Sequence, residues 1–349
     1  MCERTLDGSG VYSKIYDKRL MFLSFIIPLY NASRFITIAL DSIYKNALDE
    51  GAYEVVVIDD GSKDNGAEMV KDYASCHKNL RLLQQSNKGA SAARNRGIEA
   101  AKGEFVWFVD ADDRIEPTIL ETVWQIYQEK PETELFGFNH VDWSDGLESP
   151  RVTYRKRVST DGLGLLRSHP YMYLWNRIFR KSAIGDIRFP EGTRNTEDWY
   201  FDLMVFSQLK HVECIPENGY YYNSDNPYST LRNRSHESLR KNAEDSQLMH
   251  RLIWEEIQKT DNPGIKAELH RSLNYSVMGF FYGMFVDHFS IKEFLRAMKK
   301  YEPMGLYPIP KSGSKRGNKF LRLVNRPYLL FPVVLMRNLF SPILSFLKR

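Results

Sequence analysis

The chain has 349 residues, of which 43% are hydrophobic and 13% aromatic, and its formal net charge at pH 7 is +4. This composition can bury one large core or two moderate ones, which excludes global intrinsic disorder. Residues 311–349 contain nine Lys or Arg and no Asp or Glu, which leaves a net charge of about −5 for the remainder. A mildly acidic body excludes a nucleic-acid-binding core, and the basic end suggests contact with an anionic surface.

The first part of the chain alternates between strand and helix patterns. Residues 1–20 show no pattern and are expected to be an N-terminal extension without a role. The predicted strands are 22–27, 54–58, 80–84 and 105–109, and the predicted helices between them are 35–43, 64–74 and 89–101. The turn at 30–33 is expected to cap the first of these helices. This alternation predicts a mostly parallel α/β sheet with right-handed crossovers.

The second part is less regular. A helix at 121–130 and a strand at 135–143 are followed by an aromatic, Pro- and Gly-containing region at 151–229. Apolar spacing predicts helices from 236 to about 300, and a linker rich in Gly, Ser and Lys follows at 311–319.

The tail contains a short apolar run between basic residues. Residues 328–336 are apolar, but a membrane-spanning helix needs ~20 such residues, so this run does not cross a membrane. Its basic neighbours are Arg322, Arg326, Arg337, Lys348 and Arg349. The pattern suits an amphipathic anchor lying on an anionic leaflet, and the alternative is a terminal helix packed against the body.

Acidic residues follow two of the predicted strands. Asp60 comes after the second, and Asp110, Asp112 and Asp113 come after the fourth. Ligands of open α/β sheets bind outside the carboxyl ends of the strands. Carboxylates gathered there repel one another unless a cation or a shared proton relieves them, so they predict a metal–diphosphate site for Mg²⁺ or Mn²⁺. The alternative is a solvated acidic turn.

The same sheet edge predicts a pocket for a nucleotide sugar. Asp60 can accept a hydrogen bond from a base-ring N–H, and Tyr30, which follows Pro28 at the end of the first strand, can stack on the ring. No G-x-G-x-x-G follows the first strand and no G-x-x-x-x-G-K-[ST] occurs, which disfavours dinucleotide and P-loop sites.

Four motifs in chain order resemble those of glycosyltransferase family 2, which are inverting enzymes of GT-A fold. They are Ile26-Ile-Pro-Leu-Tyr-Asn31, Val57-Ile-Asp-Asp-Gly-Ser62, Lys88-Gly-Ala-Ser-Ala-Ala-Arg-Asn-Arg-Gly97 and Val109-Asp-Ala-Asp-Asp113. The later acidic pair and aromatic residue of the family resemble Glu197-Asp198-Trp199, and Trp175-Asn-Arg177 resembles the capsule, exopolysaccharide and lipopolysaccharide branch.

The resemblance implies a GT-A domain at 21–235, a Rossmann-like nucleotide-sugar-binding mixed sheet flanked by helices. A helical C-terminal region at 236–310 and a basic linker with an amphipathic, membrane-associating tail at 311–349 would follow. It also implies roles for residues. Asp60 would contact the uracil of a UDP-sugar, with Pro28 and Tyr30 shaping the base pocket, and Arg94 would lie by the nucleotide or its phosphates. Asp112 would be the main ligand of Mg²⁺ or Mn²⁺, supported by Asp110. Asp198 would be the general base, with Glu197 as the alternative.

The implied reaction is transfer of a hexosyl or N-acetylhexosaminyl group to a hydroxyl of a glycan or lipid-linked glycan in bacterial surface polysaccharide synthesis. The enzyme would be cytoplasmic and peripheral on the inner face of the cell membrane. A sugar nucleotidyltransferase is the first alternative, but it would need a Gly-rich basic loop where Pro28-Leu-Tyr-Asn31 stands. A catalytically silent glycan-binding protein is the second, and the intact acids argue against it.

Overall fold

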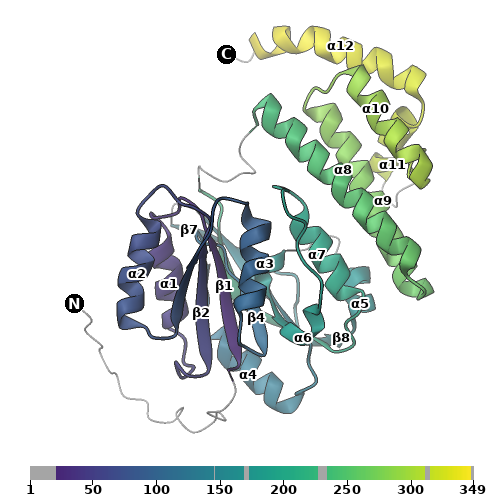
Figure 1. Ribbon diagram of the computed structural model, residues 1–349. Coiled ribbons are helices and arrows are strands. Elements are labelled where there is room, and N and C mark those ends of the chain that lie inside the picture. Colours follow the sequence, from purple (N-terminus) through teal and green to yellow (C-terminus); the bar gives the residue numbers. More distant parts are fainter. Residues whose placement is uncertain (1–20, 145, 169–172, 227–233, 311–314, 347–349) are drawn as a thin grey trace. The chain divides into compact units, whose positions relative to one another are not determined.

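The computed structural model describes residues 21–346 except 145, 169–172, 227–233 and 311–314 (Figure 1). The expected N-terminal extension, residues 1–20, lies outside the described residues. The chain forms two compact units, residues 1–232 and 233–349, each with its own core.

The first unit is built on a single mixed sheet in the order β3-β2-β1-β4-β9-β6-β10-β5. Its first four strands are parallel and read as predicted: β1 (Leu23–Leu29), β2 (Tyr53–Asp59), β3 (Leu80–Gln84) and β4 (Phe105–Phe108). The crossovers between them are α1 (Ile36–Tyr44), α2 (Gly66–Cys76) and α3 (Ala90–Ala100). Because β1, β2 and β4 are buried on both faces, they read as continuous apolar runs rather than as alternating ones.

Helices cover both faces of the parallel half of the sheet (Figure 1). On one face, Phe25 and Ile27 belong to the same core cluster as the buried residues of α1. On the other face, α3 lies so close to the sheet that a Cβ at Gly97 would stand 2.3 Å from the Ile26 side chain. Only glycine permits this approach, which brings the start of α3 next to the ends of β1 and β2.

The second half of the sheet contains antiparallel strands, which confirms the mixed sheet that the resemblance implied. β9 (Arg177–Arg180) is antiparallel to both β4 and β6 (Leu135–Ser144), and β10 (Val212–Asn223) is parallel to β6. The short strands β5 (Arg114–Ile115), β7 (Leu147–Arg151) and β8 (Val158–Thr160) add antiparallel pairs at the edges. The remaining helical segments of this unit are α4 (Ile119–Glu129), α5 (Gly162–Ser168), η1 (Leu174–Asn176), α6 (Lys181–Ile184) and α7 (Glu197–Phe206).

The prediction that the turn at 30–33 caps the first helix was wrong. α1 begins at Ile36, and no side chain caps it. The turn is tied to the loop after β2 instead, since Asn31 Oδ1 accepts from the amide of Lys63 and the Ser33 amide donates to Asp64. Asn31 has a φ of 50°, a conformation that asparagine tolerates, so the chain turns away before the helix starts.

The second unit is helical, in agreement with the predicted helical spacing after 236. It comprises α8 (His236–Lys259), α9 (Pro263–Val286), α10 (Ile291–Tyr301), η3 (Glu302–Met304), α11 (Lys315–Val324) and α12 (Pro327–Phe346). Ser235, Asn262 and Ser290 cap the first three helices through side-chain oxygens, which explains why these helices begin where they do. Of the linker predicted at 311–319, residues 311–314 lie outside the described residues, and the prediction was wrong for 315–319, which form the first part of α11.

Candidate active site

A cavity of about 1470 Å³ opens in the first unit where β1, β2 and β4 end. Its far wall comes from the segment 193–199 and from aromatic residues of β10 and η1. Every site residue expected from the sequence lines this cavity: Pro28, Tyr30, Asp60, Arg94, Asp110, Asp112, Glu197 and Asp198. Residues more than 160 positions apart in the chain therefore share one cavity.

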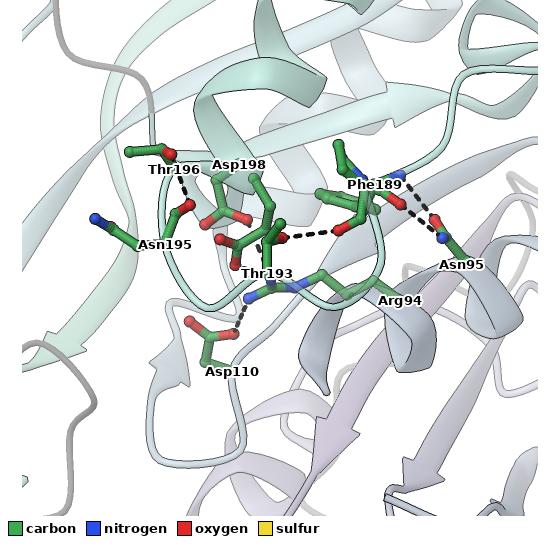
Figure 2. Close-up of polar contacts among 10 residues, drawn as sticks. Arg94, Asn95, Asp110, Phe189, Thr193, Asn195, Thr196 and Asp198 are labelled. Atoms are coloured by element: carbon green, nitrogen blue, oxygen red, sulfur yellow. Dashed lines mark hydrogen bonds and ion pairs between the residues drawn. The ribbon is translucent and has the colours of Figure 1, made fainter. Parts of the chain in front are cut away.

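Arg94 connects the two acidic groups of the cavity (Figure 2). Its Nη2 donates to Asp110 Oδ1 at 3.1 Å, and its Nη1 donates to Asp198 Oδ1 at 3.0 Å and to Glu197 Oε1 at 3.1 Å. The guanidinium is buried and its Cζ lies 5.6 Å from the centre of the Phe189 ring. Arg94 thus ties the end of β4 to the first turn of α7 by charge-assisted hydrogen bonds.

One guanidinium cannot neutralise three carboxylates. Burial raises the pKa of Asp198 above its ordinary value, and the negative charges of Glu197 and Asp110 raise it further, although Arg94 opposes them. The Asp198 side chain is 32% exposed and that of Glu197 only 11%. Asp198 is therefore the acid of this pair that is more open to the cavity, with an affinity for protons above that of an ordinary aspartate.

The loop that carries Glu197 and Asp198 is held by α3. Asn95, next to Arg94, donates from Nδ2 to the Phe189 carbonyl and accepts at Oδ1 from the Phe189 amide (Figure 2). Further along, Thr196 has a φ of 67°, which is uncommon for a β-branched residue and turns the chain into α7. Neither residue was predicted, although Asn95 stands inside the motif that contains Arg94.

Asp60 is buried and has three hydrogen-bond donors in the loop before α3. Its Oδ1 accepts from Gln85 Nε2 and from the amide of Lys88, and its Oδ2 accepts from the amide of Gly89, all at 2.8 Å. Gly89 has a φ of 91°, so this loop depends on glycine as well as on the carboxylate. Asp60 fixes the floor of the expected base pocket, a role that sequence reasoning missed.

The three aspartates after β4 divide into two groups. Asp110 and Asp112 line the cavity, whereas Asp113 is buried and accepts from the hydroxyl of Tyr220 and the amide of Asn223, both at 2.7 Å. Burial raises the pKa of Asp113 well above its usual range. Only two of the three acids expected at this strand end therefore line the cavity.

Asp110 and Asp112 fit a divalent cation. Burial and the charge of Asp110 raise the pKa of Asp112, so a bound cation would relieve an existing repulsion. Within the described ranges, no group of three or more His, Cys, Asp or Glu residues forms a complete cage for an ion. Two carboxylates match the mode in which Mg²⁺ is bound by one or two protein acids together with substrate phosphates.

An aromatic stack lies beside the aspartates that follow β4, since the Asp110 amide donates to the hydroxyl of Tyr220, a member of the stack. The Trp175 ring stacks on Tyr173 at 4.9 Å, on Tyr220 at 4.6 Å and on Tyr222 at 5.6 Å. Trp107 Nε1 donates to the Trp175 carbonyl at 2.7 Å. The indole is occupied by these neighbours, so Trp175 supports the wall, and the half-exposed Tyr173 is the ring that remains open to the cavity.

Comparison with known sequences finds a family match in the same part of the chain. Residues 24–188 match the model of glycosyl transferase family 2. The uncharacterized glycosyltransferase EpsJ of Bacillus subtilis is 28% identical over 217 residues, which cover 59% of this chain and 62% of EpsJ. The chain thus spans less than two thirds of the length of this relative.

Comparison with solved structures identifies the fold. TarS of Staphylococcus aureus in complex with UDP-GlcNAc superposes with a TM-score of 0.71 at 21% identity, covering 91% of both chains. The mannosyltransferase PcManGT of Pyrobaculum calidifontis, in complex with GDP-Man and Mn²⁺, gives a TM-score of 0.54 at 17% identity, covering 91% of this chain and 87% of the other. The predicted GT-A fold with C-terminal helices is confirmed.

Proposed function

We propose that this chain, whose residues 24–188 match the model of glycosyl transferase family 2, belongs to that family and that its cavity transfers a sugar from a nucleotide-sugar donor to an acceptor hydroxyl. The donor is a UDP-linked hexose or N-acetylhexosamine, and the reaction inverts the anomeric centre. One observation carries the proposal: a single cavity holds the acid pair Asp110 and Asp112 on one side of Arg94 and Asp198 on the other.

The donor occupies the side of the cavity made by the sheet. The hydrogen bonds from the loop do not use every lone pair of the Asp60 carboxylate, and Asp60 accepts a further hydrogen bond from the base. Pro28 and Tyr30 enclose the ring of the base. Asp112, with Asp110 beside it, would hold Mg²⁺ or Mn²⁺. When bound, this ion neutralises the charge that develops on the leaving diphosphate.

Asp198 acts on the acceptor. A hydroxyl is too weak an acid to ionise at neutral pH, so a carboxylate must take its proton as it attacks the anomeric carbon. Such general-base catalysis contributes ~10²–10⁴-fold in rate. The base must lie on the face of the sugar opposite the leaving diphosphate, and the binding of Asp198 and Asp110 to different nitrogens of Arg94 supports this division. The greater exposure of Asp198 favours it over Glu197.

The relatives suggest the pathway. TarS is named as a poly(ribitol-phosphate) beta-N-acetylglucosaminyltransferase and GgaB as a minor teichoic acid biosynthesis protein. We therefore place this chain in the synthesis of a bacterial surface glycan on a glycan or lipid-linked acceptor, at the cytoplasmic face of the cell membrane.

The test measures the release of nucleotide from a panel of UDP- and GDP-sugars, with and without EDTA. It compares the native chain with the variants Asp198→Asn and Asp186→Asn. Asp186 is an exposed acid outside the cavity and serves as the matched control. We expect EDTA-sensitive release by the native chain and the control, and a loss of ~10²-fold or more in Asp198→Asn with UDP binding retained. Full turnover by Asp198→Asn would remove Asp198 from the mechanism, and no release from any donor would favour the silent glycan-binding protein.

A further inference from the structure

The first half of α12 has an entirely apolar outer surface. Leu330 and Val334 are fully buried and mark the side of the helix that packs within the second unit. The exposed positions between 328 and 336 are Tyr328, Leu329, Pro332, Val333, Leu335 and Met336. A surface helix in water normally presents polar side chains on its outer face, so this face is suited to an apolar environment.

A basic surface precedes it on α11. Lys319 and Arg322 are exposed and three residues apart on α11, which places them on one side of the helix, and the exposed Arg326 follows in the bend after α11. Among the residues that the structure describes, no carboxylate forms an ion pair with these three side chains. The sequence from 303 to 349 contains no Asp or Glu at all, so nothing in this stretch offsets their charge.

The basic and apolar surfaces belong to one built feature. Arg326 stands directly before α12, and Asn325 anchors the bend between the helices by accepting from the Ile309 amide and donating to the Ile309 carbonyl. Tyr307 adds a hydrogen bond from its hydroxyl to the Val324 carbonyl at 3.0 Å. The bend is therefore fixed within the second unit, and the two surfaces adjoin at residues 326–328.

We propose that the outer surface of α11 and α12 binds an anionic lipid bilayer. The exposed apolar residues of α12 enter the boundary between head groups and acyl chains, and Lys319, Arg322 and Arg326 contact the anionic head groups. None of the described helices combines the length and apolarity needed to cross a membrane, so α12 lies in the plane of the surface. This surface lies outside the sugar-transfer cavity and does not depend on the proposed reaction.

The positive charge of this surface favours an anionic bilayer as its binding partner. A second copy of the chain would bring a second set of basic side chains to the same contact, where like charges repel. An anionic bilayer supplies both the negative charge and the apolar layer. Each basic residue near such a surface contributes about fivefold in affinity, so the three together contribute on the order of 100-fold.

The test is co-sedimentation of the full chain with vesicles of phosphatidylglycerol and phosphatidylcholine, compared with phosphatidylcholine alone. Two triple variants change only exposed side chains: Tyr328→Ser/Leu335→Ser/Met336→Ser on α12, and Lys319→Gln/Arg322→Gln/Arg326→Gln on α11 and in the bend after it. The control Lys45→Gln/Lys71→Gln/Lys78→Gln removes the same charge from exposed positions of the first unit, away from the cavity.

We expect the native chain and the control to bind the anionic vesicles, and less so at high salt. The α11 variant should bind on the order of 100-fold more weakly, and the α12 variant at least about tenfold more weakly. Unchanged binding by either variant overturns the proposal. The proposal also fails if the native chain does not bind vesicles but forms dimers, and the α12 variant is monomeric. Nucleotide release measured in solution should be the same in all four proteins, which separates this test from that of the reaction.

Discussion

The ionisation of Asp198 should set the pH dependence of the reaction, because a general base must be deprotonated to act. Burial and the charges of Glu197 and Asp110 raise its pKa above the ordinary 3.8. The acid limb of kcat/KM should therefore lie well above pH 4, with activity rising through a range where an ordinary aspartate is already ionised. Glu197→Gln removes one of the two charges, so it should move this limb to lower pH while retaining turnover. A pH–rate profile of both proteins measures the shift. An unmoved limb would show that another group is titrating, and a collapse of turnover in Glu197→Gln would make Glu197 the base.

Asp112 and Asp113 are neighbours in the chain, but we expect only Asp112 to contribute to metal binding. Asp112 lines the cavity, whereas Asp113 faces Tyr220 and Asn223 inside the protein. Loss of one charged contact costs ~1.5–3 kcal/mol, so Asp112→Asn should weaken the Mn²⁺-dependent affinity for UDP by roughly 10- to 100-fold. Asp113→Asn should leave that affinity unchanged, since burial already favours the neutral acid. Calorimetric titration of UDP with and without Mn²⁺ compares them, and equal losses in both variants would contradict the division.

For individual residues, the sequence predicted which side chains share the cavity, but it did not predict which hydrogen bonds connect them. The acids and Arg94 could be found because each stands in a short local motif. The hydrogen bonds from Arg94 to Glu197 and Asp198 span 103 and 104 positions, and no local pattern encodes such a pair. The inward position of Asp113 also depends on a distant partner, Tyr220, which β10 brings to the end of β4.

The segment between β3 and α3 depends on Asp60 for its shape. Asn at this position has a single acceptor oxygen for three donors, so Asp60→Asn should lose at least one hydrogen bond. We expect a loss of ~1.5–3 kcal/mol in the free energy of unfolding together with weaker UDP binding. Asp59→Asn is the matched control, since Asp59 accepts from the Ser62 amide and Gln84 but does not line the cavity. Urea unfolding and UDP titration of both variants test this, and normal UDP binding by Asp60→Asn would refute a role for Asp60 in the base pocket.

Among the elements, the parallel strands were predictable and the antiparallel ones were not. β1, β2 and β4 are buried on both faces and read as apolar runs, which the hydrophobic pattern reports directly. β9 has four residues and inserts between β4 and β6, strands that it follows by many positions. Its placement is decided by pairing with distant strands, which spacing within a short segment cannot reveal. The same insertion carries Trp175 and the segment leading to Asp198 to the cavity.

At the scale of the whole molecule, two compact units with separate cores should unfold separately. In the proposed function UDP with Mn²⁺ binds the native first unit, so at 100 times its Kd it should stabilise that unit by about 2.7 kcal/mol and leave the other transition unchanged. In the second unit, Phe281 is fully buried, and Phe281→Ala should cost ~3–5 kcal/mol there. Its transition should fall by roughly 10 °C or more, while the first stays in place.

Differential scanning calorimetry of the full chain measures both transitions at once. Leu295→Ala, at a half-exposed position of α10, is the control for a change in the second unit that removes no core volume, and it should move neither transition appreciably. A single cooperative transition that rises with UDP and falls with Phe281→Ala would mean that the two units stabilise each other. In that case a change in the second unit, which we propose binds membranes, would also alter donor affinity through the shared unfolding equilibrium. The two proposed activities could then not be varied independently.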